Sequence, residues 1–438
     1  MKLKTSFCLS VLFAASSLLG EPVPQSTEAA APGILSLDSV VSAVLSNNPS
    51  LKAARANWEA MKERIPQARA WEDPRATVDL NAGRFVDVPP NSFTDQRFMV
   101  EQPLPLSGKN RLRGRAASAD AVSAFEEFRR SELDATAKAR TAYYRLANAC
   151  AQLDVNRKNT ALLKQFAEIS RTKYEVGTHS QADVLSAETE LAKLEENAVD
   201  FERQISDAQS RLNALMNRPA RAPLGQPAAQ VLQPVALSPE KIEGLALAHR
   251  PELFMAEKQI EAAQARLDAA HKEWIPDPSV RLEAQRYNGA AQGVSELNAG
   301  FSINLPWFNR SKYRAGIREN QKLLERAQHE MEATRVETLA MVRDQIKKVE
   351  TFHHHTELAK SKLLPLAEQR VVATRLGYEA DKANFLELLT AQQSVQEIES
   401  MYWEHLADYQ MALAELEALI GAPLDPSAVT TEHHHNSK

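Results

Sequence analysis

The sequence predicts a mainly α-helical fold with a small β-sheet part, organised as two similar halves. Of its 438 residues only 14 are glycine, about 3% against a typical ~7%, and residues 115–176 and 178–218 contain neither glycine nor proline. At about 1.5 Å per residue, such runs form helices far longer than those of a compact domain. Between the long runs lie short segments in which apolar and polar residues alternate, as they do in strands.

Residues 1–31 have the composition of a secretory signal peptide. Two lysines precede residues 7–19, which are largely apolar, and small residues at Gly20 and at 29–31 offer cleavage sites. The apolar stretch is shorter than the about 20 residues that a membrane-spanning helix needs. A bulky phenylalanine precedes Cys8, so a lipoprotein is not predicted. We expect an exported chain that has no transmembrane helix.

Charge and motif content argue against several classes of protein. With 52 Lys and Arg against 57 Asp and Glu, the formal net charge is −5, which does not favour a nucleic-acid partner. The sequence contains no phosphate loop, no dinucleotide glycine fingerprint, no paired zinc histidines with a glutamate and no nucleophile elbow. We therefore expect neither catalysis nor a cofactor. Once the signal peptide is removed, Cys150 has no partner for an intrachain disulfide.

The chain contains an internal repeat. Residues 48–51 match residues 250–253 at an offset of 202, and residues 174–187 resemble residues 378–391 at an offset of 204. After the signal peptide we expect a first repeat, a linker rich in proline and alanine, a second repeat and a disordered tail, at residues 35–219, 220–239, 240–423 and 424–438. Each repeat runs from a helix through a strand hairpin to a very long helix, a tight turn and a last helix.

The strand segments have one apolar and one polar face. In the second half apolar residues occupy every second position of 280–284 and of 297–305, and the first half repeats this pattern at 78–82 and 98–100. Each run is about nine or ten residues long, the length of a tilted transmembrane strand. Four strands cannot close a barrel, and an open edge in lipid leaves backbone groups unpaired, so we expect the chain to oligomerise. The alternative is two soluble hairpins packed on the helices.

The last helix of each half has apolar residues at alternating steps of three and four, over residues 184–215 and 388–419. This heptad pattern predicts packing along the whole helix in a left-handed coil. His405 is the polar member, and we expect a hydrogen-bonded histidine because no metal-binding partner is visible at its level. Residues 353–355 are three consecutive histidines, which point about 100° apart on a helix and cannot chelate one ion alone. The tail histidines 433–435 could bind metal loosely.

Several short motifs, in this order and partly duplicated, resemble those of the TolC-like outer-membrane efflux proteins over about residues 35–423. They are Asn47-Asn48-Pro49-Ser50-Leu51, Gln102-Pro103-Leu104-Pro105-Leu106-Ser107-Gly108-Lys109, Tyr174-Glu175-Val176-Gly177, Asp183-Val184-Leu185-Ser186-Ala187 and Leu212-Asn213-Ala214-Leu215. The resemblance implies a homotrimer whose twelve strands form one shared outer-membrane β-barrel, continued in the periplasm by an α-helical barrel.

The function implied by this resemblance is an exit duct of a tripartite efflux or type I secretion system. Such a duct passively conducts small molecules or ions from a periplasmic adaptor and an inner-membrane pump to the exterior. Some relatives serve heavy-metal efflux, so metal cations are an alternative cargo. An alternative of another class is a soluble periplasmic coiled-coil scaffold, which would use the same heptads without needing alternating strands.

The resemblance places a periplasmic tip and aperture at the two helix-to-helix turns. The residues expected there are Tyr174, Gly177, Asp183, Tyr378, Asp381 and Glu387. In the family the entrance acids follow the turn of the second half; Glu387 matches the first position, but Thr390 stands at the second and Ala383 replaces a gate-linking arginine. The alternative is that Asp183 and Glu387 are first-turn acids favoured by the helix dipole.

Basic residues mark the places where strands give way to helices. They are Lys109, Arg111 and Arg113 in the first half and Lys312 and Arg314 in the second. At the inner face of the membrane these side chains are expected to contact lipid phosphates. A simply solvated helix start explains them equally well.

Overall fold

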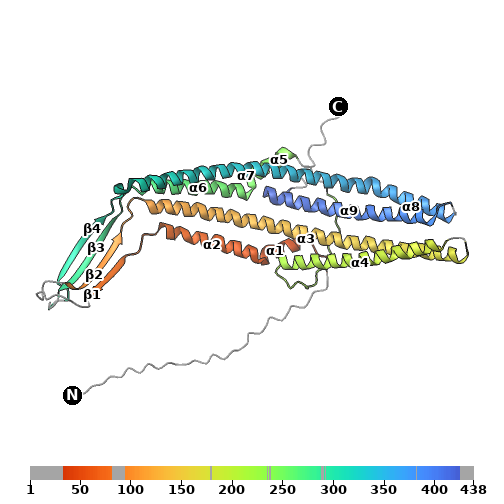
Figure 1. The fold of residues 1–438 in the computed structure, drawn as a ribbon, viewed down its shortest axis with the longest axis horizontal. Coiled ribbons are helices and arrows are strands. Elements are labelled where there is room, and N and C mark those ends of the chain that lie inside the picture. The colour runs from red at the N-terminus through yellow and green to blue at the C-terminus, as the bar shows by residue number, and fades with distance from the viewer. Residues whose placement is uncertain are drawn as a thin grey trace, which may run out of the picture.

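The computed structural model describes residues 33–80, 94–177, 180–233, 235, 238–287, 291, 293–380 and 382–424. The predicted signal peptide, the tail histidines and Asp381 lie outside the described residues. The molecule is elongated, with the strands at one end and the turns between the long helices at the other (Figure 1).

The two halves contain the same elements in the same order. The first half consists of α1 (Leu37–Asn47), α2 (Pro49–Arg69), β1 (Arg75–Leu80), β2 (Thr94–Pro103), α3 (Lys109–Glu175) and α4 (Gln181–Leu215). The second half consists of α5 (Pro239–His249), α6 (Pro251–Lys272), β3 (Pro278–Tyr287), β4 (Glu296–Ile303), the short 3-10 helix η2 (Pro306–Asn309), α7 (Arg310–Leu358), the π-turn η3 (Ala359–Leu363), α8 (Leu364–Glu379) and α9 (Phe385–Ile420).

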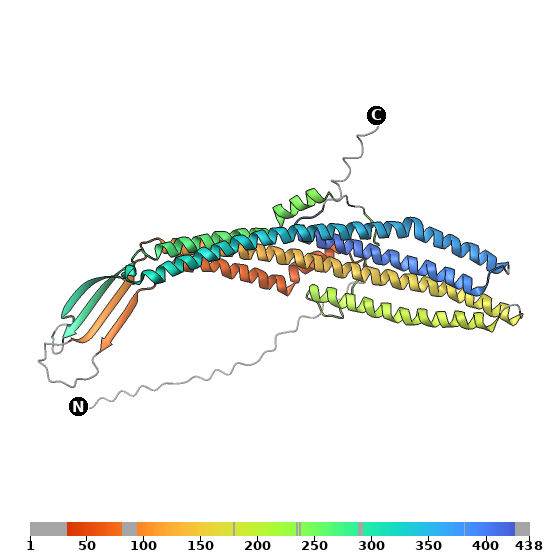
Figure 2. The ribbon, with the colours of Figure 1, turned by 45° about the horizontal axis from the view of Figure 1, so that its top comes forward.

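The long helices form a layer of four columns (Figure 2). One column is α2 followed by α4, the second is α3, the third is α6 followed by α9, and the fourth is α7 continued by α8. α3 packs against α2 and α4 on one side and against α6 and α9 on the other, while α7 packs against α6 and α9. The α2/α4 and α7/α8 columns are therefore the two edges of the layer.

The predicted glycine-free and proline-free runs are helices. α3 has 67 residues, which at about 1.5 Å per residue gives a length of about 100 Å. In the fourth column the helical path continues through Pro365, a residue that normally interrupts a helix. A π-turn of five residues directly precedes α8, and its wider spacing accommodates the missing N–H of this proline.

The joint between α2 and α4 uses the side chain of Asn48. Its Oδ1 accepts hydrogen bonds from the backbone N–H groups of Ser50 at 2.9 Å and Leu51 at 3.4 Å, which caps α2. Its Nδ2 donates to the carbonyl oxygen of Leu215 at 3.0 Å, the last residue of α4. One short side chain thus fixes the position at which two stacked helices meet.

Three apolar cores hold the columns together. The first lies around α1 and includes Val40, Val44, Leu51, Ala139, Tyr143, Leu146, Leu212 and Met216. The second is its counterpart around α5 and includes Ile242, Ala246, Val342, Ile346, Val349, Tyr409, Leu416 and Ile420. The third joins the two halves at the helical tip through Leu163, Phe166, Leu194, Tyr378, Phe385, Leu388 and Leu389.

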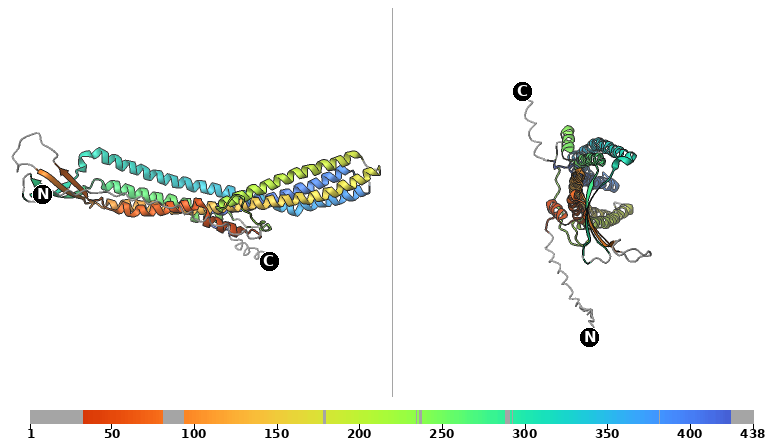
Figure 3. Two further views of the ribbon diagram at one scale, coloured as in Figure 1. Left: turned by 90° about the horizontal axis from the view of Figure 1, so that it is seen from below. Right: turned by 90° about the vertical axis from the view of Figure 1, so that its left-hand side faces the viewer.

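The four strands form one antiparallel sheet in the order β1-β2-β3-β4. β2 of the first half pairs with β3 of the second, so the sheet joins the two repeats. The register places Val78, Phe98, Ala284 and Leu297 in one row across all four strands. Figure 3 shows that the strands extend from one end of the helical layer.

Candidate functional site

The apolar face of the sheet is uncovered. Its side chains include Val78, Leu80, Phe98, Val100, Leu282, Leu297 and Phe301, each of which is at least half exposed. Leu297 reaches 72% exposure and Phe301 68%. The predicted alternation is confirmed, whereas hairpins packed on the helices do not describe this structure. An exposed apolar face of this kind marks an interaction with lipid or with another protein.

The opposite face of the sheet carries paired charges. Arg97 Nε lies 3.1 Å from Glu283 Oε1, and Arg97 Nη1 lies 3.9 Å from Asp79 Oδ2. Arg281 lies across Gly300, where a Cβ atom would come within 3.1 Å of the guanidinium Nε. The glycine therefore leaves room for a long basic side chain on this face. The sheet is apolar on one side and polar but internally neutralised on the other.

The structure corrects the expected role of Lys109 at the junction of strands and helices. Its side chain is only 3% exposed, and Nζ lies 2.7 Å from Asp277 Oδ2 and 3.5 Å from Glu273 Oε2. Nζ also donates to the carbonyl oxygen of Ile275 at 3.2 Å. Lys109 therefore fastens α3 to the segment that connects α6 with β3, and it is not available to a lipid phosphate.

The other basic residues of the junction differ from Lys109. Arg113 is half exposed and its Nη2 lies 3.4 Å from Glu273 Oε1. Arg111, Lys312 and Arg314 are exposed, and no ion pair is found for them among the described residues. Lys312 lies over the ring of its neighbour Tyr313, 5.5 Å from the centroid. These three cations are accessible at the end of the helical layer next to the sheet.

At the helical tip, Gly177 ends the α3 column. Its φ of +78° is left-handed, and its N–H donates to the carbonyl oxygen of Tyr174 at 2.9 Å. Nothing lies within 4 Å of a Cβ built there, so the backbone angle alone demands glycine. Gly177 thus lies at the helix-to-helix turn where the sequence analysis expected it. Its expected counterpart in the second half, Asp381, lies outside the described residues.

The matched tyrosines of the tip have different environments. Tyr174 is 43% exposed, whereas Tyr378 is 2% exposed. The hydroxyl of Tyr378 lies 3.3 Å from Ser170 Oγ, and Lys173 Nζ donates to the carbonyl oxygen of Tyr378 at 3.1 Å. The same ammonium lies 4.4 Å from the centroid of the Tyr378 ring. Tyr378 thus joins the tip of α8 to the tip of α3.

The two candidate acids lie in the first turns of the returning helices. Asn384 caps α9, because its Oδ1 accepts from the backbone N–H of Glu387 at 2.8 Å and its Nδ2 donates to Glu387 Oε1 at 3.3 Å. Asp183 holds the same position in α4, and its N–H donates to the carbonyl oxygen of Ser180 at 3.2 Å. Ala383 lies against Gly377. In a single chain the helix dipole is sufficient to explain both acids.

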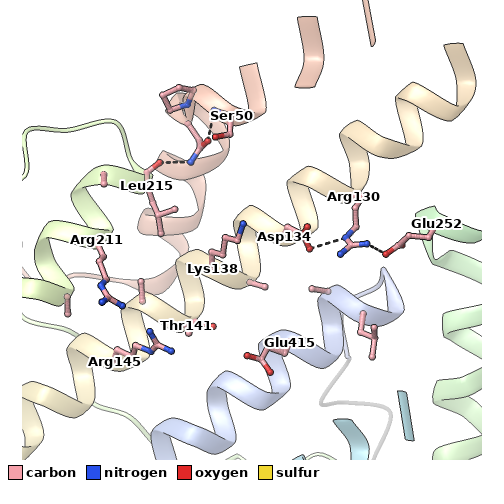
Figure 4. A pocket seen from close by; sticks show the side chains of 18 of the residues that line it. Ser50, Arg130, Asp134, Lys138, Thr141, Arg145, Arg211, Leu215, Glu252 and Glu415 are labelled. Atoms are coloured by element: carbon pink, nitrogen blue, oxygen red, sulfur yellow. Dashed lines mark hydrogen bonds and ion pairs between the residues drawn. The ribbon is translucent and has the colours of Figure 1, made fainter. Parts of the chain in front are cut away.

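A groove that the sequence analysis missed lies midway along the layer (Figure 4). Its volume is about 880 Å³, and its floor is α3 between the α2/α4 and α6/α9 columns. The charged residues that line it are Arg130, Asp134, Lys138, Arg145, Arg211, Arg250, Glu252 and Glu415. Lys138 and Arg145 are seven residues apart and lie on one stripe of α3. That spacing does not by itself indicate a groove, because it also fits a solvated helix face.

The groove and the linker lie on different sides of α3. α1 packs against Tyr143 and Leu146, whereas the groove is lined by Lys138 and Arg145. The Tyr143 hydroxyl donates to the carbonyl oxygen of Leu35 and accepts from the N–H of Ala228, each at 3.0 Å. The N-terminal helix and the linker are thus held together on the side away from the groove.

Among the helices of the described residues, none combines the length and apolar character needed to cross a membrane.

Comparisons with known proteins give a consistent result. The chain is 26% identical over 295 residues to the probable efflux pump outer membrane protein SepC of Pseudomonas putida, a match over 64% of this chain and 61% of that protein. The match thus spans about three fifths of that relative's length. It is 23% identical over 394 residues to the cobalt-zinc-cadmium resistance protein CzcC of Cupriavidus metallidurans, over 89% of this chain and 91% of CzcC.

Solved structures share the fold. The outer membrane protein VceC of Vibrio cholerae superposes with a TM-score of 0.76 at 19% identity, over 89% of this chain and 97% of VceC. The sequence model of the family described as outer membrane efflux protein matches residues 40–218 and 244–422. Because these two matches cover both halves and most of the sequence, the chain belongs to the outer membrane efflux protein family.

Proposed function

We propose that the chain is the outer-membrane exit duct of an efflux system and that it works as a homotrimer. The observation that carries this proposal is the uncovered apolar face of the sheet at one end of helices about 100 Å long. A lipid-facing sheet anchors the molecule, and the helical layer reaches from that anchor across a wide aqueous space. Catalysis has no place in this proposal.

The sheet and the helical layer both have open edges. These edges support the closure of a ring by further copies of the chain. β1 and β4 each have one neighbour in the sheet, and an unpaired strand edge in lipid costs several kcal/mol per backbone group. The edge columns expose apolar side chains, among them Leu185 and Val199 on α4, Val336 on α7 and Leu376 on α8. Contact between unlike edges generates a ring. Three copies supply twelve strands to a shared barrel, as the resemblance implies.

The tip is proposed to form the aperture and to meet the periplasmic adaptor and, through it, the inner-membrane pump. In a trimer Asp183 and Glu387 each contribute three carboxylates near this end, and a ring of carboxylates favours cations. Tyr174 is exposed at the same end, whereas the buried Tyr378 acts by holding α8 against α3. Asp381 remains a proposed member of the aperture.

At the other end, Arg111, Lys312 and Arg314 are proposed to contact lipid phosphates next to the sheet. Their exposure supports this role, and Lys109 is excluded from it by its buried ion pair with Asp277. Such contacts are each worth about 1 kcal/mol near an anionic membrane surface.

Heavy-metal cations are a second proposed cargo, beside organic molecules. The observation that favours them is the match to CzcC, which covers nearly all of both chains, whereas the match to SepC covers about three fifths of that protein.

The test is the molecular mass of the detergent-extracted chain by light scattering, followed by its conductance in planar bilayers. We expect three chains per particle and a cation-selective pore. Asp183→Asn and Glu387→Gln should lower cation selectivity, and Glu196→Gln, an exposed acid on α4 away from the tip, is the matched control. A monomer that stays soluble without detergent would overturn the duct and favour the coiled-coil scaffold.

A further inference from the structure

Two histidines that are 50 residues apart in sequence meet at the seam between α7 and α9. The ring centroids of His355 and His405 lie 5.0 Å apart with an interplanar angle of 49°. His355 is exposed at the end of the histidine triplet, and His405 is the polar member of the α9 heptad pattern. The packing of α7 against α9 therefore supplies the neighbour that the sequence did not reveal for His405.

The separation of these rings is that of two imidazoles on one metal ion. When two histidines bind a tetrahedral Zn²⁺ at about 2.0–2.1 Å from each nitrogen, their ring centroids lie about 5 Å apart. The other histidines of the triplet do not share this relation. The centroids of His354 and His355 are 6.3 Å apart, and the His353 ring lies 5.4 Å from that of Tyr409.

His405 has an unused ligand atom. Its Nδ1 is buried and has no hydrogen-bond partner among the described residues. The hydrogen bond expected from the sequence is thus not made at this nitrogen. Metal ions bind imidazole in its neutral form through such a nitrogen.

A carboxylate lies about one turn after His405 on α9. Asp408 follows His405 by three residues, is partly buried, and makes no hydrogen bond within the described structure. Asp408 also precedes Glu415 by seven residues, and Glu415 lines the groove described above. The histidine pair lies on the stripe of α9 that packs against α7, since Tyr409, four residues after His405, contacts the ring of His353.

We propose that His355 and His405 form a binding site for a borderline divalent cation such as Zn²⁺, Ni²⁺ or Cu²⁺, with Asp408 as a third ligand after a side-chain rotation. No group of three or more potential metal ligands is assembled among the described residues, so two protein ligands hold the ion first and water completes its shell. Imidazole suits these metals better than Mg²⁺ or Ca²⁺, and two ligands make binding weak and exchangeable. The site does not depend on the duct proposal.

The test is Zn²⁺ titration by calorimetry on the detergent-extracted full-length chain. All variants carry alanine at His433, His434 and His435, so that the tail histidines do not contribute. We expect one Zn²⁺ per chain. His355→Ala should weaken binding at least about tenfold, because loss of even a supporting residue of a metal site costs about 10–100-fold.

The matched control is His354→Ala, which removes the exposed neighbouring histidine and should leave binding unchanged. Asp408→Asn should weaken binding by less than His355→Ala does. His405→Phe should also weaken it, and if this variant misfolds, the exposed His355 still carries the test. Equal losses in His354→Ala and His355→Ala, or no saturable binding, would overturn the site. Because calorimetry measures no transport, this outcome is separate from failure of the trimer and conductance measurements.

Discussion

The two halves of the chain share one layout and differ at the positions where helices join or turn. Asn48 caps α2 and bonds to α4, whereas its counterpart Arg250 makes no cap, and its Nε and Nη1 have no hydrogen-bond partner among the described atoms. Tyr174 is 43% exposed at the tip and Tyr378 is 2% exposed. α3 is continuous, while the α7 column contains a π-turn.

This comparison separates two kinds of position in a duplicated protein. Apolar positions around α1 and α5 are equivalent because both helices must cover the middle of a long column. Residues at the joints and tips differ between the two halves, since they contact the other half or the surroundings. The second half carries both the buried tip tyrosine and the histidine pair, so these two features are found in one half and not in its counterpart.

The largest contrast is expected between the two tip tyrosines. Tyr378→Ala should lower the free energy of local opening at the tip by about 3–5 kcal/mol, the range for truncating a buried aromatic side chain. Tyr174→Ala should change it by no more than about 0.5 kcal/mol, because that side chain is exposed. Hydrogen exchange of the amides in α8 and early α9 measures both. Equal effects would remove the asymmetry of the tip.

A second contrast concerns the basic residues next to the sheet. Lys109→Met should lower the free energy of unfolding by about 2–3 kcal/mol. Breaking a fully buried ion pair costs about 3–5 kcal/mol, and the loss is smaller here because Asp277 and Glu273 are partly exposed. Lys312→Met should cost less than about 0.5 kcal/mol. Denaturant unfolding of the detergent-extracted protein checks the difference. An equally large loss of stability in Lys312→Met would contradict the contrast between a buried and an exposed basic residue.

Substitutions at the two helix joints, Asn48 and Arg250, should change stability by a smaller amount and in opposite directions. Asn48→Ala should destabilise by about 1 kcal/mol through loss of the cap. Arg250→Asn should stabilise by up to about 1 kcal/mol, because it offers the missing cap and removes a buried guanidinium with unpaired N–H groups. Glu252 keeps Arg130 as its partner in this variant. Thermal unfolding of both variants decides whether the asparagine joint can be transferred between halves.

The smallest effect is a pH slope carried by His405, whose counterpart in the first half is Phe201. Burial, then His355, lower the pKa of His405, while Glu404 and Asp408 raise it. The unfolded chain therefore binds the proton more readily, and stability falls as the pH drops below the unfolded pKa of about 6.5. His405→Phe should flatten thermal stability between pH 7 and 5, measured with a metal chelator present. If the pH dependence of thermal stability is unchanged in this variant, it arises from groups other than His405.

Much of the fold was predictable because it depends on periodicity. Runs without glycine or proline became α3 and α4, and the two-residue alternation became four strands with one apolar face. The break between the two glycine-free and proline-free runs also placed Gly177 at a helix end, where its positive φ was found. These features need only local backbone rules and the positions of apolar side chains.

The candidate site was less predictable. The sequence placed Lys109 with the exposed arginines, because a basic residue at a helix start has the same pattern whether it is solvated or buried. Its partner Asp277 is 168 residues away in sequence. The groove was missed for a similar reason, since its lining comes from α2, α3, α4, α6 and α9.

The sequence by itself determined the elements, their lengths and their duplication, because spacing between glycines, prolines and apolar residues acts within one helix or strand. Only the tertiary structure decided which columns are neighbours, which of two matched tyrosines is buried, and that His355 faces His405. The physical reason is that a helical stripe specifies a face to be covered but not the helix that covers it.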